Sequence, residues 1–229
     1  RSWQMEVNFK KTVKTTFTRK KQPLQFKYGT AEHTRDRIPK IRYLGTVFSS
    51  NLKWHNTFDT IRTKSLQKIG YLRRSLKSAT KECKLTAYKS LVRPFLEYTS
   101  VVWSPHFERD QVESVQKKAI RFIFSRYDRN FSPSQHYHVL SLTSLEHRQK
   151  CDLLIMQHKI VHKSVSLAAA LSFTSHSAGV TRRTDTINIT PFMYFLDCHK
   201  FSFFPHTVEI WNELDDSLRR VPTEHTVKQ

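Results

Sequence analysis

The first 50 residues contain short stretches rich in β-branched and aromatic residues, a composition typical of strands rather than helices. Three stretches, 12–19, 24–28 and 41–48, are each long enough for one strand. Proline and glycine residues lie near their ends, where a missing N–H group or an unusual φ angle is tolerated. The pattern predicts a small antiparallel sheet.

From Trp54 onward the spacing of apolar residues becomes helical. Residues three or four positions apart form one face, made of Phe58, Ile61, Ser65, Ile69, Leu72 and Leu76. The other face carries six basic residues, Arg62, Lys64, Lys68, Arg73, Arg74 and Lys77. Long cationic side chains can reach phosphate groups while the apolar face stays packed. The segment therefore predicts an amphipathic helix with a basic exposed side.

The rest of the chain also has mainly helical patterns. We expect helices from about Lys81 to near Pro94, from Asp110 to Phe124, briefly after Ser132-Pro133, from about Ser144, and over 208–218. Thr143 and Glu146 have the Thr-x-x-Glu spacing of a capping box. Residues 166–191 lose the periodicity and predict a loop. The predicted fold class is α+β, a small N-terminal antiparallel sheet followed by helices.

Composition narrows the classes of function. Only four glycines occur among 229 residues, which argues against a glycine-rich phosphate loop of the P-loop or Rossmann kind. No apolar run approaches the roughly 20 residues that cross a bilayer, and no signal-peptide layout opens the chain. Cys83, Cys151 and Cys198 form no CxxC pair, which argues against a disulfide framework or a cysteine zinc site. We expect an intracellular protein without a membrane partner.

The charge is strongly positive and unevenly distributed. Lysine and arginine number 39 against 19 acidic residues, a net charge of +20. Residues 1–98 contain 23 basic and 6 acidic residues, net +17, whereas residues 99–229 contain 16 and 13, net +3. A field of this size favours a polyanionic partner, with nucleic acid the first candidate and an anionic membrane surface the second. We expect the first half of the chain to bind it.

Two patterns have part of the layout of a metal site. His158 and His162 are four residues apart on a predicted helix, a spacing that lets two imidazoles reach one metal, but the glutamate of a metalloprotease is missing beside them. Asp215 and Asp216 form an adjacent acidic pair, but within a predicted helix rather than at a strand turn. We expect surface or partly buried histidines, a solvated acidic pair, and no catalytic residues.

Several short motifs follow one another over nearly the whole chain. In order they are Trp3-Gln4-Met5-x-x-Asn8-x-x-Lys11-Thr12, Tyr43-Leu44-Gly45, Leu52-x-Trp54, Leu72-Arg73-Arg74, 88–98 (YKSLVRPFLEY), Val102-Trp103-Ser104-Pro105, 115–123 (VQKKAIRFI), Ser144-Leu145-Glu146-x-Arg148, Phe203-Phe204-Pro205 and Trp211-Asn212. The ordered set with its spacings resembles the downstream part of reverse transcriptases from LINE-type, non-LTR retrotransposons. One departure is Leu214-Asp215, where those enzymes often carry Leu-Pro.

The resemblance implies a domain arrangement and a binding site. Residues 1–50 would be the end of the polymerase palm, 51–130 the helical thumb, and 131–229 a C-terminal helical region. The primer grip, which places the primer 3′ end, would be Tyr43, Leu44 and Gly45. A thumb binds the minor groove and backbone of an RNA–DNA template–primer duplex, a task suited to the six basic residues of the predicted helix. Lys11 would approach the triphosphate or the leaving pyrophosphate, or would be a plain exposed lysine.

The resemblance also implies what the chain lacks. The metal-binding aspartates of such enzymes would lie upstream of Arg1, so Mg²⁺ is expected in that palm, and no cofactor is expected here. The isolated chain is predicted to be inactive and to work with the remainder of the polymerase, in the cytoplasm and nucleus as a ribonucleoprotein. Two alternatives stay open, a free-standing basic RNA- or DNA-binding module and a translated relic of a decayed transposon.

Overall fold

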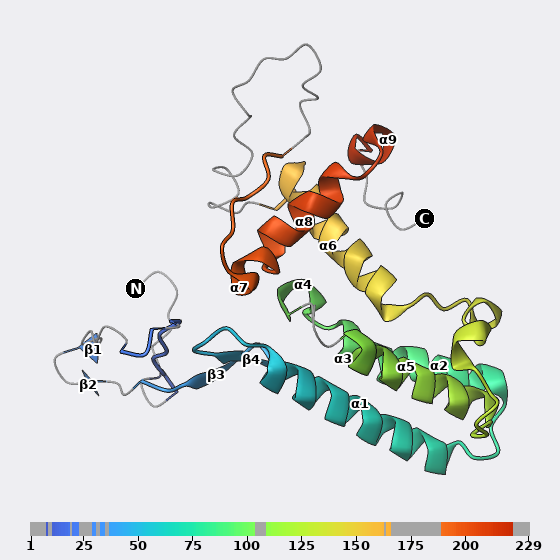
Figure 1. Ribbon diagram of the computed structural model, residues 1–229. Helices are drawn as coiled ribbons and strands as arrows, with labels where there is room; N and C mark the ends of the chain where they lie inside the picture. The colour runs from blue at the N-terminus through green and yellow to red at the C-terminus, as the bar shows by residue number, and fades with distance from the viewer. Residues whose placement is uncertain are drawn as a thin grey trace. The chain divides into compact units, whose positions relative to one another are not determined.

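The computed structural model describes residues 8, 11–18, 20–22, 29–30, 33–34, 37–103, 109–162, 164–165 and 189–221. Contacts divide the chain into two compact units, Arg1–Thr60 and Ile61–Gln229, and each is described by itself. The small antiparallel sheets lie in the first unit and most of the helices in the second (Figure 1), which confirms the predicted α+β class. None of the described helices is both long and apolar enough to cross a membrane.

The strands of the first unit form two antiparallel pairs. β1 (Gly29–Thr30) pairs with β2 (His33–Thr34), and β3 (Lys40–Tyr43) pairs with β4 (Thr46–Ser49). The predicted strand 41–48 is therefore a hairpin rather than one strand. Leu44 and Gly45 both have positive φ angles, 46° and 83°, which is the geometry of a two-residue type I′ turn and reverses the chain between β3 and β4.

Residues 12–18 do not form the predicted strand. A single parallel bridge, between Lys14 and Arg37, involves this stretch among the described residues. The Thr18 N–H also donates to the Ser50 carbonyl at 2.8 Å. Among the described residues these are isolated contacts rather than a continuous ladder. The predicted strand 24–28 lies outside the described residues.

The helices follow the predicted pattern closely (Figure 1). They are α1 (His55–Ser75), α2 (Lys81–Leu91), α3 (Arg93–Glu97), α4 (Ser100–Trp103), α5 (Arg109–Phe124), the 3₁₀ turns η1 (Pro133–His136) and η2 (His138–Leu140), α6 (Leu145–Val161), α7 (Asp197–Lys200), α8 (Phe203–Asn212) and α9 (Asp216–Arg219). As expected, α2 ends before Pro94, which lies in the first turn of α3, where an intrahelical N–H bond is not needed.

Two groups of buried residues hold the second unit together. Helices α2, α3 and α5 pack through Tyr88, Val92, Leu96, Val115, Ala119 and Phe122. Helices α6 and α8 lie side by side and share the second group, formed by Leu154, Ile189, Val208 and Trp211. Trp211, which the sequence pattern offers for packing, is thus in the core.

The predicted capping box is shifted by one residue. Ser144, not Thr143, is the N-cap of α6, because its backbone is extended and its Oγ accepts a hydrogen bond from the His147 N–H at 3.2 Å. Counted from Ser144, the third helical residue is His147 rather than Glu146, so the predicted Thr-x-x-Glu capping box does not form. Glu146 pairs with Lys150, one turn further on, at 3.2 Å.

The predicted final helix over 208–218 is in fact two helices. α8 begins earlier, at Phe203, and ends at Asn212. Asp215 then acts as the N-cap of α9, where its carboxylate accepts a hydrogen bond from the Ser217 N–H at 3.4 Å. Asp216 pairs with Arg219. The acidic pair is thus at the start of a helix rather than on the surface of a continuous one.

Candidate nucleic-acid interface

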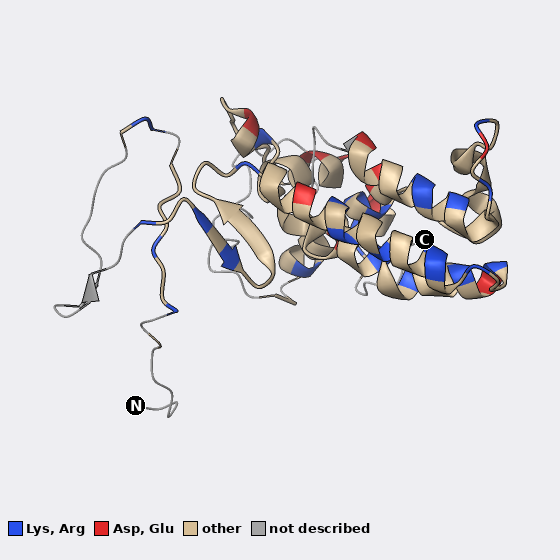
Figure 2. Ribbon diagram, turned by 90° about the horizontal axis from the view of Figure 1, so that it is seen from below, with Lys and Arg blue, Asp and Glu red and all other residues tan. Residues whose placement is uncertain are grey.

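Helix α1 presents the predicted basic face. Phe58, Ser65, Ile69 and Leu72 are buried, which confirms the predicted packed side. Of the six basic residues, Lys64, Arg73, Arg74 and Lys77 are exposed, and Arg62 and Lys68 are half-buried. Asp59 is the only acidic residue of the helix, whose lysines and arginines are blue in Figure 2. The solvent-facing side of α1 therefore has a clear positive charge.

The basic residues of α1 do not form one row. With about 100° of rotation per residue, Arg62 and Arg73 lie on one flank of the buried stripe, and Lys64 and Lys68 lie on the other. Arg74 lies opposite the stripe, and Lys77 follows the end of the helix. Cations on both flanks can reach two separate rows of phosphates.

Each flank also has a cation placed over an aromatic ring. The Arg73 guanidinium lies 5.8 Å from the centre of the Tyr127 ring, and the Lys68 ammonium lies 4.9 Å from the centre of the Phe95 ring. Such contacts are worth about 0.5–1 kcal/mol at exposed sites and restrict the orientation of the cation. Two of the predicted phosphate-binding side chains are therefore held in place by the second unit itself.

The β3–β4 turn places the predicted primer-grip residues at the surface of the first unit. Tyr43 is 62% exposed and Leu44 is 71% exposed. A leucine with positive φ is uncommon, and this conformation costs about 1 kcal/mol. Both side chains are therefore accessible at the surface of the first unit.

Side chains at the start of α1 fix the base of this hairpin. Thr57 Oγ1 donates to the Val47 carbonyl at 2.5 Å, and Asn56 Nδ2 donates to Ser49 Oγ at 3.2 Å. The Phe48 ring packs edge-to-face against Trp54, with ring centres 5.2 Å apart. The turn thus stands on a fixed base within the first unit.

Lys11 is exposed in the same unit. Its backbone N–H donates to the Asn8 carbonyl at 3.1 Å. Its predicted role at the triphosphate stays a prediction.

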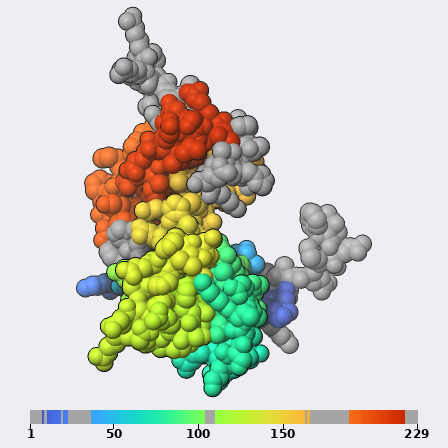
Figure 3. Space-filling view, turned by 90° about the vertical axis from the view of Figure 1, so that its right-hand side faces the viewer, coloured from blue at the N-terminus to red at the C-terminus, as the bar shows by residue number. Residues whose placement is uncertain are grey.

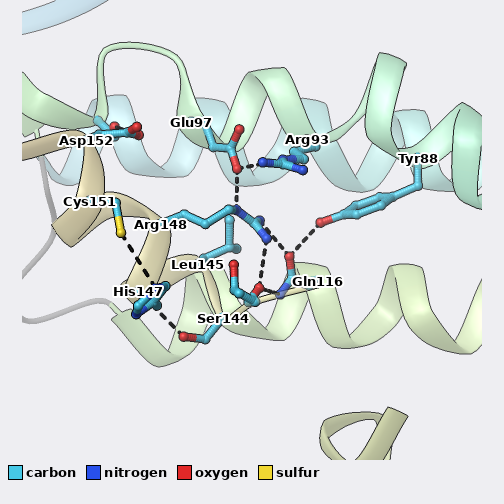
Figure 4. A network of polar contacts seen from close by, with 12 residues as sticks. Tyr88, Arg93, Glu97, Gln116, Ser144, Leu145, His147, Arg148, Cys151 and Asp152 are labelled. Carbon is cyan, nitrogen blue, oxygen red and sulfur yellow. Dashed lines mark hydrogen bonds and ion pairs between the residues drawn. The ribbon is translucent and has the colours of Figure 1, made fainter. Parts of the chain in front are cut away.

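A buried polar network connects four helical segments of the second unit (Figure 4). At its centre is Arg148 of α6, which is 9% exposed. Its Nη2 donates to Gln116 Oε1 at 2.8 Å, its Nη1 donates to the Thr143 carbonyl at 2.7 Å, and its Nε forms an ion pair with Glu97. Tyr88 also donates to Gln116 Oε1, at 2.8 Å. One arginine therefore joins α2, α3, α5 and α6.

The network continues through the neighbouring carboxylates. The same oxygen of Glu97 accepts a hydrogen bond from Arg93 Nε at 2.8 Å. Glu113 accepts hydrogen bonds from the Tyr137 hydroxyl and from the Leu145 N–H, the latter at 2.9 Å, and so holds the start of α6. Polar groups in such a network stabilise the fold only when each has a partner, so its members depend on one another.

The network residues come from three of the motifs that carry the family resemblance. Tyr88 and Glu97 belong to 88–98, Gln116 belongs to 115–123, and Arg148 ends the motif that begins at Ser144. The sequence interpretation did not assign them a role. A signal was present, since Gln116 lies one turn from Val112 and Ile120 on the apolar side of α5. A polar residue on a buried face has to find a partner.

Burial raises the pKa of the Tyr88 hydroxyl to about 12. The folded state therefore keeps a proton that the unfolded chain loses near pH 10, and the stabilisation from this group, complete below pH 10, is lost as the pH rises towards 12. At pH 11 the loss is about 1 kcal/mol. We expect the melting temperature of Tyr88→Phe to fall less between pH 9 and 11 than that of the unchanged protein. Equal falls in both proteins would contradict this assignment.

The two histidines of α6 bond to the C-terminal segment. His158 is buried, and its Nε2 lies 2.5 Å from the Val221 carbonyl. His162 is exposed, and its Nε2 lies 3.1 Å from the Arg219 carbonyl. Both imidazole rings therefore contact backbone carbonyl groups of the C-terminal segment, and the two ring centres are 4.1 Å apart. In the part of the chain that the structure describes, no group of three His, Cys, Asp or Glu residues could hold a metal ion.

Comparisons of the chain with family models, with curated proteins and with solved structures find no match.

Proposed function

We propose that the chain is the template–primer-binding part of an RNA-directed DNA polymerase from a LINE-type transposable element, comprising the primer grip, thumb and tail. The observation that carries the proposal is helix α1. One side of this long helix is packed, and the rest of its circumference presents basic residues with a single carboxylate among them. Such a surface binds a polyanion with little selection among bases.

An RNA–DNA duplex is the polyanion that this helix fits best. The minor groove of an A-form helix is wide and shallow, and recognition there relies on shape and backbone contacts. In such a groove, the flank with Arg62 and Arg73 faces one phosphate row, and the flank with Lys64 and Lys68 faces the other. Arg74, opposite the packed stripe, faces the floor of the groove.

Two further observations support the polymerase proposal over a general basic module. The predicted primer grip forms an exposed turn in which Leu44 and Gly45 both have positive φ, a turn that would let backbone approach a primer end closely. In addition, three motifs that resemble the polymerase family meet in one buried network around Arg148. Nucleotidyl transfer would belong to the upstream palm, and the chain's own role would be to hold and orient the duplex.

The salt dependence of duplex binding tests the α1 interface. In the α1 glutamine variant, four of its residues are neutralised to glutamine, namely Arg62, Lys68, Arg73 and Arg74. For an RNA–DNA duplex, the slope of log Kd against log salt should fall by roughly 3 units, because each lost phosphate contact removes about 0.7–0.9 from this slope. Fluorescence anisotropy over a range of salt concentrations measures this slope.

A matched control variant has the same net charge as the α1 glutamine variant. Four basic residues outside α1 are neutralised to glutamine in the same way, namely Lys89, Lys118, Lys150 and Arg220. We expect this control to change the slope by less than about 1 unit, because distant charges are screened at physiological salt. Equal slopes for the two variants would show that the duplex binds elsewhere.

A further inference from the structure

A second basic surface lies at the end of the second unit where α1 stops. The segment 125–130, which follows α5, lies against the α1–α2 turn there, and Figure 3 looks onto both. The buried ammonium group of Lys84 joins them, since it donates to Ser125 Oγ at 2.7 Å and to the Lys77 carbonyl at 3.4 Å. Segments 41 or more residues apart in sequence thus form one local surface.

The end of α5 fixes the direction of this segment. The Ser125 N–H donates to the Phe122 carbonyl at 3.1 Å, and the Arg126 N–H donates to the Arg121 carbonyl at 3.0 Å. These two bonds form a Schellman motif, in which the residue with positive φ is usually glycine. Ser125 occupies that position with a φ of 53°. A serine is useful here because its hydroxyl is the partner of Lys84.

Tyr127 is presented on this surface as an open aromatic ring. Its side chain is 53% exposed, and the Arg73 guanidinium lies 5.8 Å from the ring centre. Arg126 and Arg129, close to it in sequence, are exposed, and so are Arg74 and Lys77, which follow Arg73 along the chain. Arg126 is at 3.8 Å from the exposed Asp128, a weak pair that leaves the local charge positive. We call Arg73, Arg74, Lys77, Tyr127 and Arg129 the platform.

We propose that the platform binds an unpaired strand of nucleic acid, with one base stacked on Tyr127 and its phosphates beside Arg74, Lys77 and Arg129. Stacking on an aromatic ring next to cations is the usual way in which proteins bind single strands. In a duplex the base faces are covered by their neighbours, so the ring offers little to paired nucleic acid. The inference rests on the proposed function, according to which the chain binds nucleic acid. It adds that the strand bound at the platform is unpaired.

The test compares two probes, a single-stranded RNA of about 12 nucleotides and a blunt RNA–DNA duplex of the same length, by fluorescence anisotropy at one salt concentration. Tyr127→Ala should weaken binding of the single strand by about 10-fold and binding of the duplex by less than about 2-fold. Tyr127→Phe, which keeps the ring, should bind both probes as the unchanged protein does. Tyr98→Ala is the matched control. Tyr98 is also 53% exposed, but its neighbour in sequence is the acidic Glu97, which would repel a phosphate.

The outcomes separate this inference from the proposed function. If Tyr127→Ala leaves single-strand binding unchanged, or weakens both probes equally, the platform is not a single-strand site. The inference is also wrong if Tyr127→Phe loses as much affinity for the single strand as Tyr127→Ala. It is wrong, too, if the unchanged protein does not bind the single strand, and the platform then serves another class of partner. If instead the α1 glutamine variant binds duplex normally while Tyr127→Ala still weakens single-strand binding selectively, the duplex proposal fails and the platform stands.

Discussion

Arg148→Met should lower the free energy of unfolding by about 3 kcal/mol, the largest stability effect that we expect from one substitution in this chain. The methionine keeps most of the volume but leaves Glu97 and Gln116 without their shared partner in a largely buried place. For a domain of this size the change corresponds to a fall of roughly 6–12 °C in melting temperature. Thermal melts followed by circular dichroism measure it.

Arg93→Met is the matched control for this prediction. Arg93 bonds the same Glu97 oxygen as Arg148, but its side chain is 32% exposed. Exposed ion pairs contribute little, so we expect a loss of less than about 1 kcal/mol. Adding Glu97→Gln to Arg148→Met should recover part of the lost stability, because the carboxylate has by then lost one of its two cationic partners and keeps only Arg93. Equal losses for Arg93→Met and Arg148→Met would mean that the network is not centred on Arg148.

The same melts address whether the chain is a relic of a decayed element. A network that joins four helical segments requires them to fold together, so the unchanged protein should melt in one cooperative transition. A relic without a fixed fold would show no transition. A cooperative melt that Arg148→Met shifts and Arg93→Met barely shifts would therefore support a maintained fold.

Gly45→Asn should reduce primer extension by on the order of 100-fold when this chain is joined to an upstream polymerase palm, because misplacing a reacting end by about 1 Å can cost that much. Asparagine tolerates positive φ better than other residues with a Cβ, so the β3–β4 turn should survive. The added side chain would stand where the primer 3′ end and the backbone are proposed to approach each other. Duplex affinity should change by less than about threefold, since the α1 cations supply most of it.

Gly45→Val separates crowding at the primer end from loss of the turn. Valine is branched at Cβ and disfavoured at a φ of 83°, so it should destabilise the hairpin as well as block extension. We expect the asparagine variant to match the melting curve of the unchanged protein and the valine variant to melt earlier. If the asparagine variant extends primers normally, the turn is an ordinary hairpin and the primer-grip proposal is wrong.

The sequence determined the helical part of the fold well. The three- and four-residue spacing of apolar positions in α1 and α5 identified both helices and their buried sides, because burying one face of a helix requires that period. The positive charge of α1 could also be predicted from the sequence, since Asp59 is the only acidic residue among its cations. These features are local, so they could be recognised from short stretches of sequence.

The sequence was less informative where a partner segment decides the outcome. Residues 12–18 have strand composition but no ladder, because strand formation depends on a neighbour that composition does not specify. The hairpin at 41–48 was not predicted because its turn needs a positive φ at Leu44 as well as at Gly45, and leucine rarely adopts that conformation. The final helix divides at Asp215, where an aspartate inside an apparent helical pattern proved to be a cap.

Only the tertiary structure decided how the side chains of distant segments meet. Arg148, Gln116 and Glu97 are up to 51 positions apart, yet they share one buried network. Lys84, Ser125, Arg73 and Tyr127 form the platform region in the same way. Helical spacing assigns each of these residues to a face of its own helix but not to a partner. The partner is fixed by helix packing, which depends on the whole buried core at once.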